Sequence, residues 1–259
     1  MGGTQEPQYN RIGVDYNAIT ELPCNKLEQE LISMALGDCT GFKILDLAGG
    51  TGLKAVQAID AGAVSVDVVD ISSAMAEVAE AHQKHLNESK GRIRAHVADC
   101  SKPLAEQGLS NLEPASFDIV MGNWLFEYAG SVENLTAMWT NITTYLKPGG
   151  KFLGIRVTDN FDADYMQEGK YGAIITASER TTKGCKYRIR FKTDPQVEFD
   201  CAATHESMSM DETIPRGLGL GDFLIVDPKS TKVVRGNQEF WEAFITKPCY
   251  KVVTARKRS

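Results

Sequence analysis

The sequence predicts an α/β fold with a mostly parallel, seven-stranded sheet, helices on both of its faces and an antiparallel lid insertion. Two observations lead to this fold class. From Phe42 onward, short apolar stretches rich in β-branched residues alternate with helical segments through short connections, as in a parallel sheet that helices cover on both faces. After Thr158 this alternation gives way to a period of two, which is typical of antiparallel strands.

Five strands are expected in the first 158 residues, and helical segments separate them. The expected strand ranges are 43–48, 64–70, 93–100, 117–125 and 151–157. The helix before the fifth strand places Leu135, Met138 and Trp139 on one face, and the sequence Pro-Gly-Gly at 148–150 ends it.

The lid insertion is expected in the segment that follows the fifth strand. Tyr187, Ile189 and Phe191 alternate there with basic residues, and the segment 199–206 comes soon after them, so a pair of antiparallel strands is predicted. The chain then returns to the main sheet. Capping-box spacing predicts a short helix that begins near Ser209, and segments 223–227 and 250–257 have the composition of strands.

Composition and charge exclude several classes of protein. The chain has 259 residues and a formal net charge of −6, which argues against a nucleic-acid partner, because phosphate backbones attract clustered lysine and arginine. Its six cysteines are scattered and no histidine has metal-ligand spacing, so we expect reduced thiols and no metal. No signal-peptide core and no membrane-length apolar run occur, so we expect a cytoplasmic protein without a membrane partner, as a monomer or weak dimer.

A glycine-rich loop follows the first strand and indicates a nucleotide-like ligand. Gly50 and Gly52, with Ala55 three residues further on, fit the dinucleotide fingerprint of Rossmann-like folds, and Asp70 lies about twenty residues beyond. Asp46 ends the strand at the mouth of the loop, where its carboxylate would repel a pyrophosphate and attract a cation. This favours S-adenosylmethionine, which carries an ammonium and a sulfonium, over NAD.

Other strand ends supply the remaining contacts that such a ligand needs. Asp70 suits the ribose diol, because a carboxylate accepts two hydrogen bonds. Ile71 and Met75 are expected on the two faces of the adenine, and Asp99 with Cys100 is expected at its edge. The carboxyl ends of parallel strands meet in one crevice, so these residues are expected to converge.

At these residues the chain resembles the class I S-adenosylmethionine-dependent methyltransferases, over roughly residues 9 to 158. Residues 45–52 look like the family's glycine-rich first motif and residues 117–123 like its fourth. Ala48 replaces the first glycine of the strictest pattern, and Gly49 stands where the family has cysteine or glycine. The resemblance implies S-adenosyl-L-methionine as cofactor, S-adenosyl-L-homocysteine as product, and Ala48 and Gly49 among the cofactor-binding residues.

The N-terminal segment carries a closer resemblance. Residues 9–16 look like the start of the ubiquinone-methyltransferase and toxoflavin-biosynthesis group, and fungal secondary-metabolite methyltransferases, including thiol methyltransferases, are similar. The resemblance implies that this segment closes over the cofactor, with Tyr16 near the methionine carboxylate and Tyr9 facing the methyl group. We therefore expect four parts in the chain: an N-terminal helical cap over the cofactor (1–40), the cofactor-binding core (41–158), the lid (159–208) and the C-terminal part of the sheet (209–259).

Acceptor-binding residues are expected after the fourth strand and in the lid. Asn123 and Trp124 are expected near the methionine end of the cofactor, and the acceptor pocket is expected to be formed by Phe126, Tyr128, Tyr165 and Tyr171. His205 is the candidate base of the lid. Because no stronger base stands out, transfer to sulfur or nitrogen of a small molecule is favoured over oxygen, plausibly in secondary metabolism on a substrate such as a thiol-bearing toxin.

Three alternatives to this function stay open. One is an NAD-dependent dehydrogenase that uses the same glycine loop, which Asp46 and the absence of a Tyr-x-x-x-Lys pair oppose. Another is a methyltransferase with a protein acceptor, and the last is a binding module that keeps the cofactor pocket without catalysis.

Overall fold

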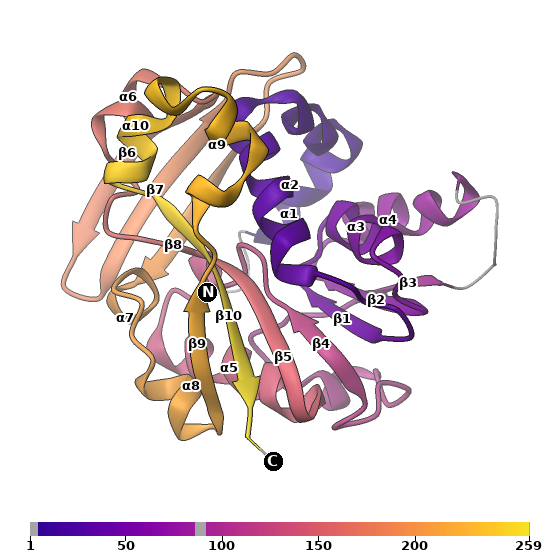
Figure 1. The fold of residues 1–259 in the computed structure, drawn as a ribbon. Coiled ribbons are helices and arrows are strands. Elements are labelled where there is room, and N and C mark those ends of the chain that lie inside the picture. The colour runs from indigo at the N-terminus through magenta and orange to yellow at the C-terminus, as the bar shows by residue number, and fades with distance from the viewer. Residues whose placement is uncertain (1–4, 86–91, 259) are drawn as a thin grey trace.

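A computed structural model describes residues 5–85 and 92–258, and its largest element is a sheet of seven strands (Figure 1). The strands follow the order β3-β2-β1-β4-β5-β10-β9. Their bounds are β1 (Lys43–Leu47), β2 (Ser65–Asp70), β3 (Ile93–Val97), β4 (Phe117–Met121), β5 (Leu146–Val157), β9 (Leu220–Ile225) and β10 (Tyr250–Lys257). The first five pair in parallel, and β10 runs antiparallel to both of its neighbours. The predicted fold class is confirmed.

The sheet order reverses at β1, which determines where a ligand can bind. From β1 the chain proceeds to β2 and β3 on one side, and then to β4 and β5 on the other. The connections leave in opposite directions there, so a crevice forms at the carboxyl ends of β1 and β4. Asp46 and Met121 are paired across these two strands, next to that crevice.

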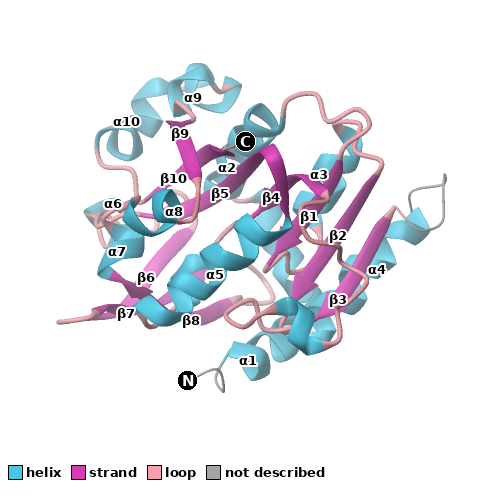
Figure 2. Cartoon of the chain, turned by 90° about the horizontal axis from the view of Figure 1, so that it is seen from below, coloured by secondary structure: helices cyan, strands magenta, loops and turns pink. Residues whose placement is uncertain are grey.

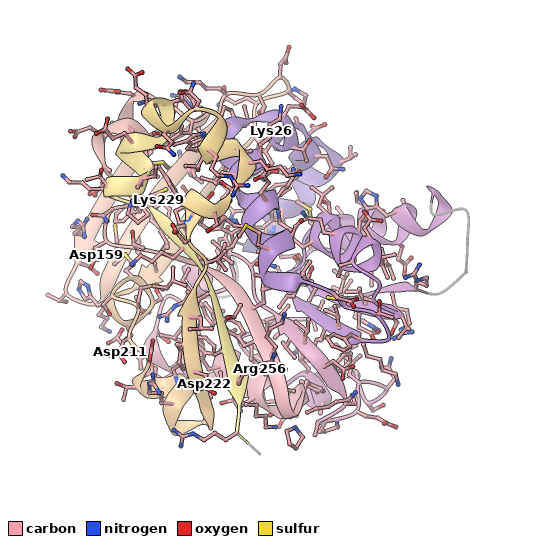
Figure 3. All side chains as sticks on the ribbon, viewed as in Figure 1. Lys26, Asp159, Asp211, Asp222, Lys229 and Arg256 are labelled. Atoms are coloured by element: carbon pink, nitrogen blue, oxygen red, sulfur yellow. The ribbon has the colours of Figure 1, made fainter. Side chains whose placement is uncertain are left out.

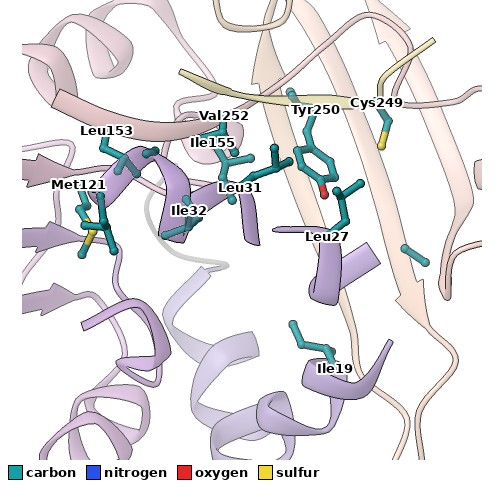
Figure 4. Packing of buried hydrophobic residues seen from close by; sticks show 14 of the residues in the cluster. Ile19, Leu27, Leu31, Ile32, Met121, Leu153, Ile155, Cys249, Tyr250 and Val252 are labelled. Atoms are coloured by element: carbon teal, nitrogen blue, oxygen red, sulfur yellow. The ribbon is translucent and has the colours of Figure 1, made fainter. Parts of the chain in front are cut away.

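Alternate residues of the strands pack into two helical layers. Ile44 belongs to the cluster that contains α2 (Pro23–Leu36) and α3 (Leu53–Asp60), whereas Leu45 belongs to the cluster on the other face, with α5 (Val132–Tyr145). In the first cluster, residues of α2 contact β5 and β10, as Figure 4 shows for Leu27, Leu31, Ile32, Leu153, Ile155 and Val252. The helices therefore fix the strands whose ends form the crevice.

Local sequence explains where these helices begin and end. Pro23 stands in the first turn of α2, where its missing N–H is not needed. The Ser131 side chain accepts a hydrogen bond from the Asn134 N–H and caps α5, which ends before Pro148. The helix α4 (Ser73–His85) follows Ser72, whose hydroxyl accepts a hydrogen bond from the Met75 N–H at 3.2 Å.

The lid region contains an antiparallel sheet of three strands, one more than the predicted pair. Its strands are β6 (Ala173–Thr181), β7 (Gly184–Phe191) and β8 (Glu198–Thr204), in the order β6-β7-β8. The strand β6 was missed because its second half, residues 176–181, is polar and exposed and lacks the alternation of β7. Figure 2 shows the small sheet at one end of the main sheet, near α1 (Gln5–Ile12).

Short helices flank the small sheet and the last two strands. α6 (Asp164–Glu168) precedes β6, α7 (His205–Met208) and α8 (Thr213–Gly217) lie between β8 and β9, and α9 (Lys232–Gly236) and α10 (Gln238–Thr246) lie between β9 and β10. The helix expected from Ser209 begins later, at Thr213, because the Asp211 carboxylate accepts the Thr213 N–H at 2.6 Å and turns the chain first. Exposed charged side chains occur on several elements of the surface, such as those labelled in Figure 3.

The N-terminal segment joins the two sheets. It comprises α1, the 3-10 helix η1 (Gly13–Glu21) and α2. The Gln8 side chain exchanges two hydrogen bonds with the backbone of Asp200 in β8, at 3.0 and 3.1 Å. Asn10 accepts a hydrogen bond from the Ser72 hydroxyl, before α4, at 2.6 Å. Across the described ranges, no helix has both the length and the apolar character that crossing a membrane requires.

Candidate functional site

A cavity lies at the carboxyl ends of the first four strands, with the small sheet on its far side. Asp46 of β1, Asp70 of β2, Asp99 after β3 and Asn123 after β4 all line it. Residues that are far apart in the sequence therefore meet at one edge of the sheet.

The glycine-rich loop after β1 approaches this cavity with an unusual backbone. Ala48, Gly50 and Gly52 have φ angles of 55°, 56° and 78°, in the left-handed region that glycine adopts without strain. A Cβ atom on Gly49 would lie 2.8 Å from Asp46 Oδ2 and 2.7 Å from a methyl group of Val68. Close packing therefore requires glycine at position 49, whereas Ala48 accepts a strained conformation.

Asp46 is a buried polar group of the cavity whose side chain lacks hydrogen bonds among the described residues. Its side chain is fully buried, and neither carboxyl oxygen has a hydrogen-bond partner within the part of the chain that the structure describes. Burial raises the pKa of Asp46 to about 7, with Asp70 adding to the increase and Lys54 opposing it. A buried carboxylate without a partner is unfavourable, so this position is suited to an incoming cation.

Asp70 holds the glycine loop in place. Its Oδ2 accepts the Gly50 N–H and its Oδ1 accepts the Ser72 N–H, both at 2.9 Å. Burial raises the pKa of Asp70, and these backbone hydrogen bonds oppose the increase. Each oxygen keeps a second lone pair, so the expected ribose contact is compatible with this structural role.

The expected adenine-binding residues also line the cavity. They are Ile71, Met75, Asp99 and Cys100. One carboxyl oxygen of Asp99 accepts hydrogen bonds from the Ser101 N–H at 2.9 Å and from the Ser101 hydroxyl at 2.6 Å. Partial burial acts to raise the pKa of Asp99, but these hydrogen bonds and Lys102 outweigh it, so the pKa is lowered. Asp99 is therefore a charged acceptor at the edge of the cavity.

Asn123 and Trp124 follow β4 and face the cavity from the other side of the reversal point. Neither the oxygen nor the nitrogen of the Asn123 amide has a partner within the described residues, although the side chain is buried. Trp124 has a φ of 57° and donates its indole N–H to Glu28 Oε2 at 2.9 Å. Glu28 Oε1 lies 2.7 Å from Lys54 Nζ, so α2 and α3 are joined across the cavity wall.

An aromatic wall closes the cavity opposite the glycine loop. The hydroxyl groups of Tyr9 and Tyr128 are hydrogen-bonded to each other, and the Tyr9 ring packs 5.4 Å from the Phe199 ring of β8. Tyr16 stacks on Phe199 at 6.2 Å. Tyr187 of β7 completes this wall. The predicted Tyr9, Tyr16 and Tyr128 therefore line the cavity.

Five predicted site residues do not line the cavity: Gly52, Phe126, Tyr165, Tyr171 and His205. His205 is exposed, and its Nε2 lies 3.1 Å from the carbonyl oxygen of Thr181, so it is removed from the candidate bases.

The other four of these residues contribute to the packing of the fold instead of lining the cavity. Phe126 is fully buried and stacks on Trp139 at 4.3 Å. Tyr165 and Tyr171 donate their hydroxyl hydrogens to backbone carbonyls of Lys247 and Phe240, at 2.6 and 2.8 Å, so both serve packing. A Cβ atom on Gly52 would lie 2.9 Å from the Cβ atom of Ala79 in α4, so this glycine allows close packing of the loop on that helix.

The cavity also contains residues that the sequence did not single out. Glu28, Lys54, Tyr187, Phe199 and Cys201 all line it, and so does Glu127, which the sequence places only at the margin of the acceptor pocket. The period-two pattern of β7 indicated an apolar face for Tyr187, but it did not indicate what that face would cover. The sequence does not indicate that Glu28 and Lys54 form an ion pair, because the two residues lie on different helices.

The cavity fits S-adenosylmethionine in its arrangement of polar groups. Unpartnered buried oxygens of Asp46 and Asn123 are available to an ammonium group, while Asp70 and Asp99 offer acceptors to ribose and adenine. No cluster of three or more potential metal ligands occurs within residues 5–85 and 92–258.

Part of the chain matches a known family model. Residues 44–150 match the family model described as Methyltransferase domain. A search of the curated proteins found no match. Over residues 44–150, the chain is therefore similar to methyltransferase domains.

Solved structures share the fold at low sequence identity. An S-adenosylmethionine-dependent methyltransferase from Mesorhizobium loti is 20% identical, with a TM-score of 0.58, over 89% of this chain and 98% of that chain. Geranyl diphosphate C-methyltransferase from Streptomyces coelicolor, solved with Mg²⁺, geranyl diphosphate and S-adenosyl-L-homocysteine, is 14% identical, with a TM-score of 0.55, over 91% of this chain and 78% of that chain. These similarities extend across the lid and the main sheet.

Proposed function

We propose that this protein transfers a methyl group from S-adenosylmethionine to a heteroatom of a small molecule. The proposal depends mainly on the environment of Asp46, at the reversal point of the sheet. Its carboxyl group is fully buried, and neither oxygen has a hydrogen-bond partner among the described residues. A pyrophosphate would be repelled at this position, whereas the ammonium of S-adenosylmethionine would neutralise the carboxylate.

The chain's own residues would hold the cofactor along the strand ends. Asp46 and Asn123 face the methionine end, Asp70 the ribose, and Asp99 the adenine, with Met75 against the ring. When bound, S-adenosylmethionine supplies an activated methyl group on a sulfonium. The chain contributes alignment of the acceptor with that methyl group and exclusion of water from the site.

The lining of the cavity supports a neutral, weakly polar acceptor. Tyr9, Tyr128, Tyr187 and Phe199 form an aromatic wall, and such walls suit flat apolar molecules. A protein acceptor is the second candidate, but α1 and β8 are joined by Gln8 and Asp200 beside this wall, which leaves less room for a peptide. A thiol or amine of a secondary metabolite is compatible with the wall.

We divide the chain by role as follows. Residues 1–40 act as a helical cap over the cofactor and residues 41–158 as the cofactor-binding core. Residues 159–208 act as the lid that binds the acceptor, and residues 209–259 complete the sheet. The hydrogen bond from Trp124 to Glu28 supports this division, because it links the core to the cap at the cavity.

Calorimetric titration with S-adenosylmethionine, S-adenosylhomocysteine and NAD tests the proposal. We expect micromolar binding of the first two ligands and none of NAD. Labelled methyl groups would then reveal transfer to thiol, amine and hydroxyl acceptors. Binding of NAD alone would replace the proposal with the dehydrogenase alternative, and cofactor binding without transfer to any acceptor would favour a binding module.

A further inference from the structure

Glu127 is a buried acid of the cavity wall that the proposed function has not used. It lies in the 3-10 helix η3 (Phe126–Tyr128) after β4, and it is 1% exposed. Its Oε1 accepts the N–H of Val157, at the end of β5, at 2.9 Å. Its Oε2 has no hydrogen-bond partner within the described residues. One oxygen is therefore anchored to the sheet, while the other is available to a ligand.

The described groups that face Glu127 form no ion pair with it, although the charge of Arg156 acts on it. Arg156 of β5 is the nearby cation, but one of its terminal nitrogens donates to the backbone carbonyls of Glu206, Ser207 and Asp211, at 3.1 to 3.3 Å. Tyr187 of β7 and Cys201 of β8 face it from the small sheet and are uncharged, because burial raises the pKa of each. Among the described residues Glu127 forms no ion pair.

This environment lets Glu127 exchange a proton near neutral pH. Burial raises the pKa of Glu127 to about 7, while its hydrogen bond from the Val157 N–H and the charge of Arg156 oppose the increase. An acid whose pKa lies close to the working pH is an efficient general base, because it is ionised in a useful fraction and still binds the proton firmly.

We propose that Glu127 is the general base of the reaction and that the acceptor is a phenol or another hydroxyl compound of low polarity. The proposal rests on the proposed methyltransferase function. The aromatic wall of Tyr9, Tyr128 and Phe199 accommodates the ring of such a molecule, and Glu127 Oε2 accepts its hydroxyl hydrogen. A hydroxyl needs this help because it ionises far less readily than a thiol, so oxygen becomes the preferred acceptor atom.

The transfer balances in atoms and charge. A lone pair of the acceptor oxygen forms the new bond to the methyl carbon, and the electron pair of the broken carbon–sulfur bond stays on sulfur. The oxygen–hydrogen bond breaks at the same time, its electron pair stays on oxygen, and the proton passes to Glu127 Oε2. The carboxyl group then returns this proton to water when the product leaves.

The test uses Glu127→Gln, which removes the charge and keeps the shape, and Glu206→Gln as the matched control. Glu206 also has a carboxyl oxygen without a partner among the described residues, but it does not line the cavity. Calorimetric binding of S-adenosylhomocysteine first shows that each variant folds with an intact cofactor site. The acceptor probes are 2-naphthol and its thiol analogue, with labelled S-adenosylmethionine and a range of pH.

With 2-naphthol, we expect the wild-type rate to rise about tenfold per pH unit below about pH 7 and then to level off. Glu127→Gln should be about 100-fold slower or more and should lose this rise, since general bases contribute about 10²–10⁴-fold. Transfer to the thiol should change much less, and Glu206→Gln should match the wild type. With S-adenosylhomocysteine bound, so that Asp46 is paired with the ammonium, the infrared band of a protonated carboxyl group that titrates near neutral pH should disappear in Glu127→Gln even without acceptor.

Several results would overturn the inference. They are equal rates for Glu127→Gln and the wild type, an equal loss in Glu206→Gln, or wild-type transfer to the thiol but not to the naphthol. An infrared band that persists in Glu127→Gln with S-adenosylhomocysteine bound would also overturn it. If transfer reaches the thiol but not the naphthol, the methyltransferase function stands while the base is rejected. Failure of the wild type to bind either S-adenosylmethionine or its product would instead reject the proposed function itself.

Discussion

Asp46→Asn should make the ligand-free protein more stable above neutral pH while weakening cofactor binding. The wild-type carboxyl group is buried without a partner among the described residues, and burial raises its pKa from 3.8 to about 7. The folded state therefore binds more protons than the unfolded state between these two values. As a result, the free energy of unfolding falls as the pH rises through this window, and the penalty is complete above about pH 7.

The magnitude follows from the pKa. Each pKa unit corresponds to about 1.4 kcal/mol, so the increase at Asp46 to about 7 corresponds to a penalty of about 4 kcal/mol when the group is fully ionised. The asparagine amide would also lack partners, which costs about 1–3 kcal/mol. We expect a net gain in stability of about 1–3 kcal/mol above neutral pH for the variant. The charges that face this group are Lys54, which pairs with Glu28, and Asp70, and the substitution leaves them in place.

Urea denaturation of both proteins at about pH 5 and about pH 8 measures this difference, because the advantage of the variant should appear mainly at the higher pH. Calorimetry should show about 10- to 100-fold weaker binding of S-adenosylhomocysteine, since a charge-assisted hydrogen bond contributes about 1.5–3 kcal/mol. Wild-type binding should release a proton below about pH 7, visible as a heat that depends on the buffer. Equal pH dependence of stability in the two proteins, or unchanged affinity, would refute the role of Asp46.

Three further substitutions separate binding from packing. Asp70→Ala should weaken cofactor binding by about 2–4 kcal/mol in calorimetry and should also lower the melting temperature, because it removes the acceptor of the Gly50 N–H; unchanged affinity in a folded variant would contradict the ribose assignment. Gly49→Ala should destabilise the fold by about 1–3 kcal/mol in urea, because its Cβ would lie 2.8 Å from Asp46 Oδ2. Tyr165→Phe should lose about 1 kcal/mol of stability with unchanged cofactor affinity, since its hydroxyl donates to the Lys247 carbonyl and the residue does not line the cavity; weaker cofactor binding would return Tyr165 to the site.

The cofactor side of the cavity was predictable because it depends on local signals. Asp46, Asp70 and Asp99 each stand at or just after the end of an apolar strand, and the glycines that follow Asp46 mark the turn into a helix. The topology rules of parallel sheets then bring such ends to one edge. In the structure, all three carboxyl-bearing residues line the same cavity.

The acceptor side was less predictable because it is built by long-range contacts. Tyr165 and Tyr171 have the composition of pocket residues, yet their hydroxyls bond backbone carbonyls and they pack in the first core cluster. His205 was chosen by residue type alone, and its position beside Thr181 at the surface follows from the turn of the small sheet. Residue type does not indicate which direction a side chain faces in an inserted sheet.

The sequence by itself determined the alternation of strands and helices, the glycine loop and the acidic strand ends, because period and turn chemistry are local properties of the chain. Only the tertiary structure decided which side chains meet across the cavity. Glu127 became a candidate base because β5 occupies one of its oxygens and the small sheet buries it. Burial and the choice of partner depend on segments distant in the sequence, and these two factors set the charge and reactivity of a side chain.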